Sequence, residues 1–173
     1  MTTSDGIIIE ANKFYRKEEK KLAMAQRANK KKKVQKIHAK IKNKRKDFNH
    51  KLSTELSKKY SAIFVGDVNS SALAKTKMAK SVYDAGWSQF KTMLLYKCEH
   101  TGAWYEEVNE AFSTQVCSTC GTRCGPKGLK ELGIREWTCS HCHTVHHRDI
   151  NAAKNILACG RARLAAGIPA NLS

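Results

Sequence analysis

The sequence predicts an α/β fold that is interrupted by a metal-binding insertion. A short apolar run at residues 62–68 and an alternating segment at residues 103–110 have the pattern of strands, and the stretch from Asp84 to Gly102 between them has the pattern of a helix. Strands separated by helices indicate an α/β core, and the first run is apolar enough to be a buried, central strand. Four cysteines between residue 110 and a final helix predict the insertion.

These cysteines, Cys117, Cys120, Cys139 and Cys142, form a C-x2-C-x18-C-x2-C array. Two close pairs of thiolates are what a tetrahedral zinc ion requires, and Gly121 supplies the tight turn after the first pair. The alternative is two disulfides or four unrelated thiols, but the spacing favours one structural zinc ion. Further candidate ligands nearby are a spare thiol and several imidazoles: Cys124, His141, His143, His146 and His147.

The charge of the chain points to an anionic partner. The formal net charge is +17, and the first sixty residues hold 19 Lys and Arg against 6 Asp and Glu. An odd total of seven cysteines without an amino-terminal signal segment argues for a reducing, cytoplasmic location. No apolar run approaches the ~20 residues that span a bilayer, so no membrane partner is expected.

Residues 14–60 are predicted to form two antiparallel helices with a turn near residues 28–31. Val34, Ile37 and Ile41 begin an apolar stripe at helical spacing that continues to Leu56. The lysine run at residues 30–33 is either a solvated helix end or a surface that faces phosphates, and the extended excess of charge favours phosphates. The candidate nucleic-acid-binding residues are Lys30, Lys31, Lys32, Lys33, Lys40, Lys44, Arg45 and Arg148.

The ends of the chain carry two further expectations. The dipeptide Asp5-Gly6 predicts a hairpin turn within residues 1–9. Near the other end, Asp149 is placed to cap a helix over residues 150–159, with Gly160 ending it.

Several side chains have expected environments. Trp137 should pack against the ribbon, and Cys98 and Cys159 should be buried packing residues. Glu106 and Glu107 are expected to face solvent from their strand.

The cysteine array with its flanking segments, STQVCSTCG, REWTCSHC and HHRDINAAKNIL, resembles the carboxy-terminal region of the OrfB/TnpB proteins of insertion sequences. The segments FVGDVNSS and KIHAKIKNKRKDFNHKLST are also similar to that family, in the same order. The resemblance implies part of a RuvC-like, RNase H-type nuclease core with a basic helical hairpin and an inserted zinc ribbon. It implies a protein that uses a guide RNA to find and cut DNA with magnesium or manganese.

The family's catalytic set is Asp, Glu, Asp, and the resemblance implies that Asp149 is the last member. The first aspartate of the family precedes the segment that matches TTSDG and has no counterpart in this sequence. The usual glutamate position is Gly66, which cannot bind metal, and Asp67 should point to the opposite face of the strand. Glu110, at the end of the next predicted strand, is the proposed substitute if the two strands are neighbours.

The expected organisation is a partial core over residues 1–114 with the basic hairpin at 14–60, a zinc ribbon at 115–146, and a last helix and tail at 147–173. The first hypothesis for the function is a transposon-encoded, TnpB-like portion of an RNA-guided DNA endonuclease, with DNA and guide RNA as partners. The alternative is a catalytically inactive zinc-ribbon protein that binds DNA or RNA.

Overall fold

The computed structural model describes residues 1–10, 12–68, 86–128, 131 and 133–167. The chain divides into two compact units. The first unit comprises Met1–Glu10, Phe64–Val68 and Glu106–Ser173, and the second comprises Ala11–Ile63 and Asn69–Tyr105. The expected helix start at Asp84 lies outside the described residues.

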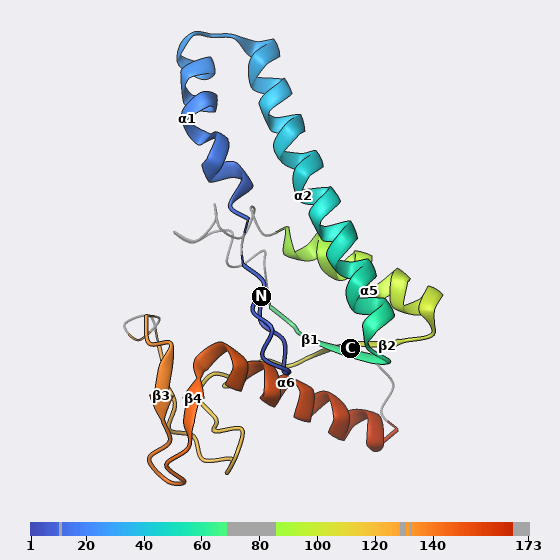
Figure 1. The fold of residues 1–173 in the computed structure, drawn as a ribbon, viewed down its shortest axis with the longest axis vertical. Helices are drawn as coiled ribbons and strands as arrows, with labels where there is room; N and C mark the ends of the chain where they lie inside the picture. Colours follow the sequence, from blue (N-terminus) through green and yellow to red (C-terminus); the bar gives the residue numbers. More distant parts are fainter. Residues whose placement is uncertain (11, 69–85, 129–130, 132, 168–173) are drawn as a thin grey trace. The chain divides into compact units, whose positions relative to one another are not determined.

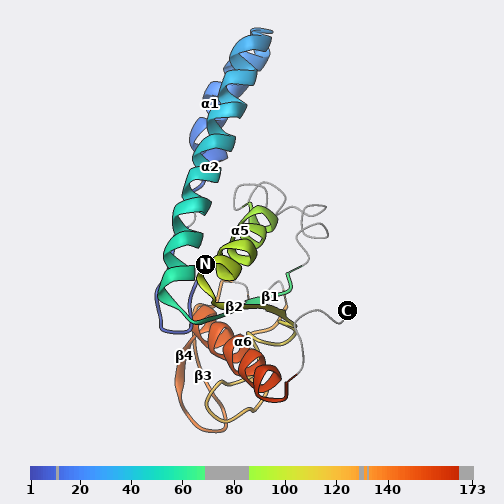
Figure 2. The same ribbon diagram turned by 90° about the vertical axis from the view of Figure 1, so that its right-hand side faces the viewer.

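A helical hairpin forms most of the second unit. Helices α1 (Phe14–Arg27) and α2 (Lys31–Lys59) lie side by side (Figures 1 and 2), which confirms the predicted pair of helices and the position of the turn. Asn29 in the turn has a φ of 51°, and the Lys30 N–H donates to the Ala25 carbonyl at 2.9 Å. The buried core of the hairpin consists of Leu22, Ala25, Ile37 and Ile41.

Helix α5 (Trp87–Thr101) packs against α2 within the same unit. The ammonium of Lys97 donates to three oxygens of α2, at 2.6–2.7 Å: the His50 carbonyl and the hydroxyls of Ser53 and Thr54. Burial lowers the pKa of Lys97. Gly102, with a φ of 71°, ends the helix as predicted. Cys98 is buried in this helix, as expected.

Strands β1 (Ala62–Gly66) and β2 (Trp104–Val108) pair with each other. The Trp104 N–H donates to the Ser61 carbonyl at one end, and the Asp67 N–H donates to the Val108 carbonyl at the other. The strands therefore run parallel, which is the arrangement that a connecting helix permits. Strand β1 is less buried than the sequence predicts, since only Val65 and Gly66 are fully covered.

The first unit contains the cysteine-rich ribbon and the last helix. Strand β3 (Glu136–Thr138) pairs antiparallel with β4 (Val145–His147), with Trp137 opposite His146. These two rings lie 4.9 Å apart between centroids, which confirms that Trp137 packs within the ribbon. The amino terminus forms the predicted turn, with an antiparallel bridge between Thr2 and Ile8.

Helix α6 (Arg148–Ala165) is longer than the sequence predicts. The prediction that Gly160 ends it is wrong, because Gly160 is buried within the helix and any Cβ there would collide with the ring of Phe64. The glycine thus permits close packing rather than a turn. The expectation that Cys159 is buried is also wrong, since it is exposed. In the described part of the chain, no helix combines the length and apolar character that crossing a bilayer requires.

Candidate metal and nucleic-acid sites

The four array cysteines come together in the first unit. The Sγ atoms of Cys117, Cys120, Cys139 and Cys142 all lie within 4.8 Å of one another. The Cys117–Cys142 and Cys120–Cys139 Sγ distances are both 3.6 Å. A tetrahedral zinc ion with bonds of ~2.3 Å would set its sulfurs ~3.8 Å apart, so the cluster fits zinc in size as well as in ligand type.

The two cysteine pairs are built in the same way. In the first pair, the Cys117 N–H donates to the Thr122 carbonyl and the Gly121 N–H donates to the Cys117 carbonyl, both at 2.9 Å. In the second, Cys139 N–H bonds to the Thr144 carbonyl at 2.9 Å and His143 N–H to the Cys139 carbonyl at 3.0 Å. Gly121 (φ 77°) and His143 (φ 55°) occupy equivalent left-handed positions.

The thiols differ in how readily they ionise. Hydrogen bonds from Thr122 lower the pKa of Cys120 to about 5. A backbone hydrogen bond from Cys142 favours the Cys139 thiolate, but burial and the neighbouring thiols outweigh it and raise the pKa of Cys139 to about 12. Metal binding must therefore displace at least one thiol proton, so the affinity of the cluster depends on pH.

Two of the nearby candidates lie against the cluster. The Cys124 Sγ is 3.4 Å from the Cys139 Sγ, and the Nε2 of buried His146 is 3.0 Å from the Cys117 Sγ. A neutral imidazole that donates to a thiolate stabilises its charge and fixes its direction. His146 is therefore the histidine placed to support the cluster, and Cys124 is a fifth thiol at its edge.

Asp149 lies in the first turn of α6, two residues after the N-cap residue His147. The prediction that it caps the helix is wrong, because the helix begins at Arg148, two residues earlier than predicted, and the Arg148 N–H donates to the Arg135 carbonyl at 2.6 Å. The Asp149 carboxylate instead accepts from the Arg135 guanidinium at 3.0 and 3.3 Å. With 40% of its side chain exposed, the carboxylate remains accessible.

Glu110 occupies the space beside Gly66. A Cβ built at Gly66 would lie 2.5 Å from Glu110 Oε2 and 3.0 Å from Glu110 Cβ. The Glu110 N–H donates to the Asp67 carboxylate at 3.2 Å, which ties the end of β2 to the end of β1. The carboxylate that follows β2 thus stands where a side chain from β1 would begin.

Among the described residues, the cysteine cluster is the only set of three or more acidic, histidine or cysteine ligand groups within 4.8 Å of one another. Asp149 and Glu110 belong to the same unit, and among the described residues neither is a member of such a group.

Sequence reasoning missed the residues that join the ribbon to α6. Asn151 is buried, and its amide nitrogen donates to the carbonyls of Ser113 and Val116 at 3.2 and 2.8 Å. Asn155, one turn later, donates to the same two carbonyls at 2.8 and 2.7 Å. Two asparagines at i and i+4, on one face of the last helix, were the available signal.

The prediction that Glu106 faces solvent is wrong. Glu107 is exposed as predicted, but Glu106 is 1% exposed. Its carboxylate accepts a short hydrogen bond, 2.5 Å, from Arg163 of α6. Fifty-seven residues separate the two partners, so no local pattern in the strand could reveal this pairing.

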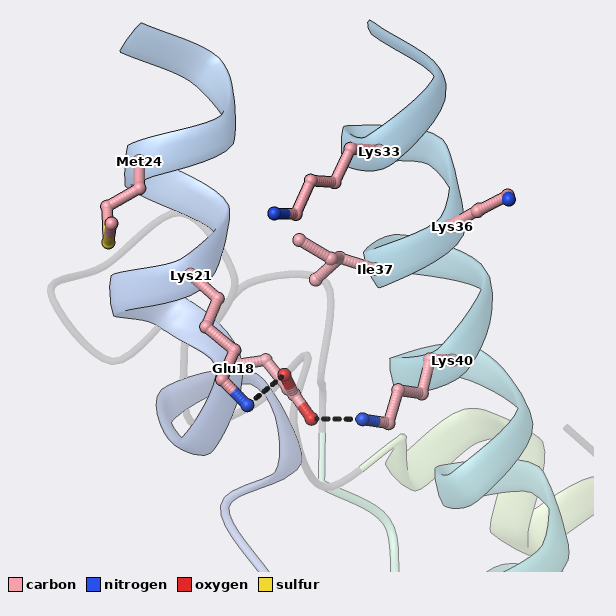
Figure 3. A pocket seen from close by; sticks show the side chains of 7 residues that line it. All are labelled: Glu18, Lys21, Met24, Lys33, Lys36, Ile37 and Lys40. Carbon is pink, nitrogen blue, oxygen red and sulfur yellow. Dashed lines mark ion pairs between the residues drawn. The ribbon is translucent and has the colours of Figure 1, made fainter. Parts of the chain in front are cut away.

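The basic residues of the hairpin surround a cavity of about 440 Å³ between α1 and α2. Figure 3 shows Lys33 and Ile37 of α2 pointing toward α1, while Lys40 reaches Glu18. The Lys40 ammonium lies 3.0 Å from the Glu18 carboxylate, and this hydrogen bond lowers the pKa of Glu18. Lys40 is thus partly neutralised, whereas the exposed lysines at residues 30–33 extend from the start of α2.

Of the remaining basic candidates, Lys44 is exposed and Arg45 is half-buried on α2. Arg148 is 8% exposed, and its guanidinium donates to the Glu131 carbonyl at 3.3 Å. This position within the first unit does not favour a phosphate contact by Arg148.

Two family models match different parts of the chain. Residues 7–77 match the OrfB_IS605 family, described as "Probable transposase", and residues 87–156 match the "Cas12f1-like, TNB domain". Together the two matches cover most of the chain, with the transposase-family model on the first part and the TNB-domain model on the second. The chain belongs to the OrfB/TnpB family of insertion-sequence proteins.

The relatives are longer than this chain. A Streptomyces pristinaespiralis protein named "Putative RNA-guided DNA endonuclease" is 40% identical over 96% of the chain and 44% of its own length. The Escherichia coli (strain K12) protein InsQ, which has the same description, is 31% identical over 96% of the chain and 48% of its own length. The chain therefore spans less than half the length of these relatives.

A solved structure has a similar fold. The protein in the "Cryo-EM structure of the Cas12f1-sgRNA-target DNA complex" superposes with a TM-score of 0.65 over 86% of this chain and 42% of its own. Its sequence identity of 18% supports a shared fold alone.

Proposed function

We propose that this chain forms part of a TnpB-like, RNA-guided DNA endonuclease with an RNase H-type core, in which Glu110 and Asp149 are catalytic carboxylates. The observation that carries the proposal is that Glu110, which follows β2, fills the space that a side chain at Gly66 of the neighbouring strand β1 would enter. Relatives named as RNA-guided DNA endonucleases support DNA and guide RNA as partners. A reducing cytoplasm would keep the cysteines available for zinc.

Carboxylate oxygens are the donors that Mg²⁺ and Mn²⁺ prefer, so Glu110 and Asp149 suit these ions chemically. Two such ions, when bound, supply an activated water and stabilise the leaving oxygen in phosphodiester hydrolysis. Glu110 would hold its carboxylate in place through the backbone contact with Asp67, and Asp149 through the first turn of α6. Arg135 would have to release Asp149 before that carboxylate could serve.

The ribbon at residues 115–146 is proposed to hold one structural zinc ion on Cys117, Cys120, Cys139 and Cys142. Four thiolates complete the coordination of zinc and leave no open position for a reaction. Its role would be to hold the segment that leads into Asp149.

The test is a cleavage assay with Mg²⁺ or Mn²⁺ on single- and double-stranded DNA, with and without RNA from the end of the element. Glu110→Gln and Asp149→Asn should each abolish cleavage, whereas the nearby exposed Glu107→Gln should leave it unchanged. The decisive variant is Gly66→Glu combined with Glu110→Ala, which moves the carboxylate back to β1. Restored cleavage supports the proposal, and full activity of Glu110→Gln would refute the role of Glu110.

The second candidate is a zinc-ribbon protein that binds nucleic acid without cutting it. It is favoured because neither Asp149 nor Glu110 belongs to a cluster of three or more ligand groups among the described residues. Salt-sensitive binding without cleavage in the same assay would support this function. Replacement of the four lysines at residues 30–33 by glutamine should then reduce the salt dependence, because each phosphate contact contributes to the slope.

A further inference from the structure

An exposed aromatic ring lies beside the proposed nuclease site. Phe112 follows Glu110 by two residues in the segment between β2 and the first cysteine pair, and it is 50% exposed. Its φ is 63°, in the left-handed region that a bulky side chain rarely adopts. Backbone strain of this kind persists only where the surrounding structure maintains it, and it concentrates at ligand-binding positions.

Hydrogen bonds on both sides of Phe112 hold this conformation. Its carbonyl accepts from the N–H groups of Gln115 and Val116, at 2.8 and 3.0 Å. Just before it, the Glu110 carbonyl accepts from the Ser113 N–H at 3.0 Å. The turn that follows the Glu110 carboxylate is therefore well defined, and it directs an aromatic ring to the surface.

The ring is backed by a cation. The guanidinium carbon of Arg123 lies 3.6 Å from the centroid of the Phe112 ring, and the Arg123 Nε–H donates to the Gln115 side chain at 2.9 Å. One face of the ring is thus covered by a guanidinium that is itself held in place. Phe112 is still 50% exposed, so the residue remains accessible to a ligand even with Arg123 in contact with its ring.

An exposed aromatic face backed by a fixed cation suits a flat, electron-rich ring. Nucleobases stack on such surfaces whatever their sequence, because every base has a π-face, and the cation adds to the attraction. A base must leave its own stack to reach the ring, so a single strand is the fitting ligand rather than a duplex.

We infer that Phe112, supported by Arg123, is a stacking platform for an unpaired base of the nucleic acid handled at the Glu110 site. The inference rests on the proposed function, since it takes the nucleic-acid partner from there. The platform would hold the strand near the Glu110 carboxylate without selecting its sequence.

The test uses the 173-residue chain with zinc and without added Mg²⁺ or Mn²⁺. The probe is a short single strand that carries a fluorescent adenine analogue whose emission falls on stacking. DNA and RNA strands of the same sequence, and the corresponding DNA duplex, form separate arms. The wild-type chain should quench the fluorescence of the analogue in a single strand. Comparing the DNA strand with the RNA strand then identifies which nucleic acid supplies the stacked base.

Replacing Phe112 should remove the stack and leave charge-based binding intact. Phe112→Leu should abolish quenching and weaken single-strand binding about 5- to 150-fold, with the same salt slope. Phe112→Trp should retain both quenching and affinity. Phe112→Gly should behave like Phe112→Leu while relieving the left-handed backbone, so a loss of binding in that variant does not arise from strain.

Zinc content and melting temperature should match the wild type in each variant, and Val145→Ala, at another exposed apolar position of the same unit, should bind normally. Normal quenching by Phe112→Leu would overturn the platform while leaving nucleic-acid binding intact. An equal loss of duplex and single-strand binding would also overturn it. Failure of the wild-type chain to bind any strand would overturn the proposed function itself, and the platform with it.

Discussion

At the scale of single residues, the most consequential contact is the ion pair between Arg135 and Asp149. The guanidinium lies 3.0 Å from a carboxylate oxygen that the proposed function assigns to a divalent ion. The arginine and the metal ion therefore compete for one group. The amino-terminal ammonium also interacts favourably with Asp149, although burial is the larger influence and lowers the pKa of that ammonium.

Arg135→Ala should lower the Mg²⁺ concentration needed for half-maximal cleavage. An exposed ion pair contributes ~0.2–1 kcal/mol, so the shift should be up to about fivefold. Arg135→Lys, which keeps the positive charge, is the matched control and should stay close to the wild type. If the alanine and lysine variants have the same metal requirement as the wild type, Arg135 does not compete with the ion.

Asn151→Ala should destabilise the first unit. The substitution leaves the Ser118 N–H without its 2.9 Å acceptor and removes two donors from the carbonyls of Ser113 and Val116. Loss of buried hydrogen bonds of this kind costs about 1–3 kcal/mol, measurable by urea unfolding.

Asn155→Ala is the comparison, because the Asn155 amide shares both carbonyl acceptors, whereas the Ser118 N–H donates to Asn151. It should cost less than Asn151→Ala, and the double variant should cost more than the sum of the two, since each asparagine alone still serves the shared carbonyls. Strict additivity would show that the two asparagines act independently.

At the scale of helices and strands, the position of Gly160 in α6 reverses the usual preference for alanine over glycine inside a helix. Alanine normally stabilises a helix interior by about 1 kcal/mol relative to glycine. Here a Cβ would enter the ring of Phe64 on β1, so Gly160→Ala should destabilise the protein by about 1–3 kcal/mol. In a Phe64→Ala background the same substitution should become neutral or stabilising in thermal unfolding. A stabilising effect of Gly160→Ala in the wild-type background would contradict this packing.

Helices and strands with strong local patterns were predictable from the sequence. The apolar stripe of α2 and the short apolar run of β1 predicted these elements nearly to the residue, because helical spacing and a short run of β-branched and aromatic residues are each typical of one element type. The end of α6 was not predictable, since Gly160 has the sequence signal of a helix terminus but serves a contact with Phe64.

The candidate site likewise has features that the sequence could predict and features that it could not. The cysteine cluster followed from spacing alone, because two close pairs impose their own geometry. The burial of Glu106 and the pairing of Asp149 with Arg135 depend on partners from distant or unpatterned segments, so neither could be read locally. The stacking of Arg123 on Phe112 also requires the fold of the turn between them.

At the scale of the whole molecule, the two compact units differ in what stabilises them. All four cysteines of the cysteine cluster belong to the first unit, whereas the helical hairpin of the second unit has an apolar core of its own. Metal binding should therefore stabilise one unit far more than the other.

Removal of zinc with a chelator should unfold the ribbon while α1, α2 and α5 keep most of their helical signal. Hydrogen exchange should show rapid loss of protection around residues 117–147 and little change at residues 31–59. The double variant Cys139→Ser/Cys142→Ser should behave like the chelated protein, and Cys124→Ser should retain one equivalent of zinc. Simultaneous unfolding of both units would show that the metal supports the entire molecule.

The contact between Gly66 and Glu110 also constrains how this protein can change over evolutionary time. Any residue with a Cβ at position 66 would occupy space that Glu110 already fills, so positions 66 and 110 cannot vary independently. Across related chains, a carboxylate at one of these positions should coincide with a small or neutral residue at the other. If two substitutions exchanged the glycine at position 66 and the glutamate at position 110, the carboxylate would stay in the same place in the structure. An alignment of such chains would show a conserved carboxylate at neither position.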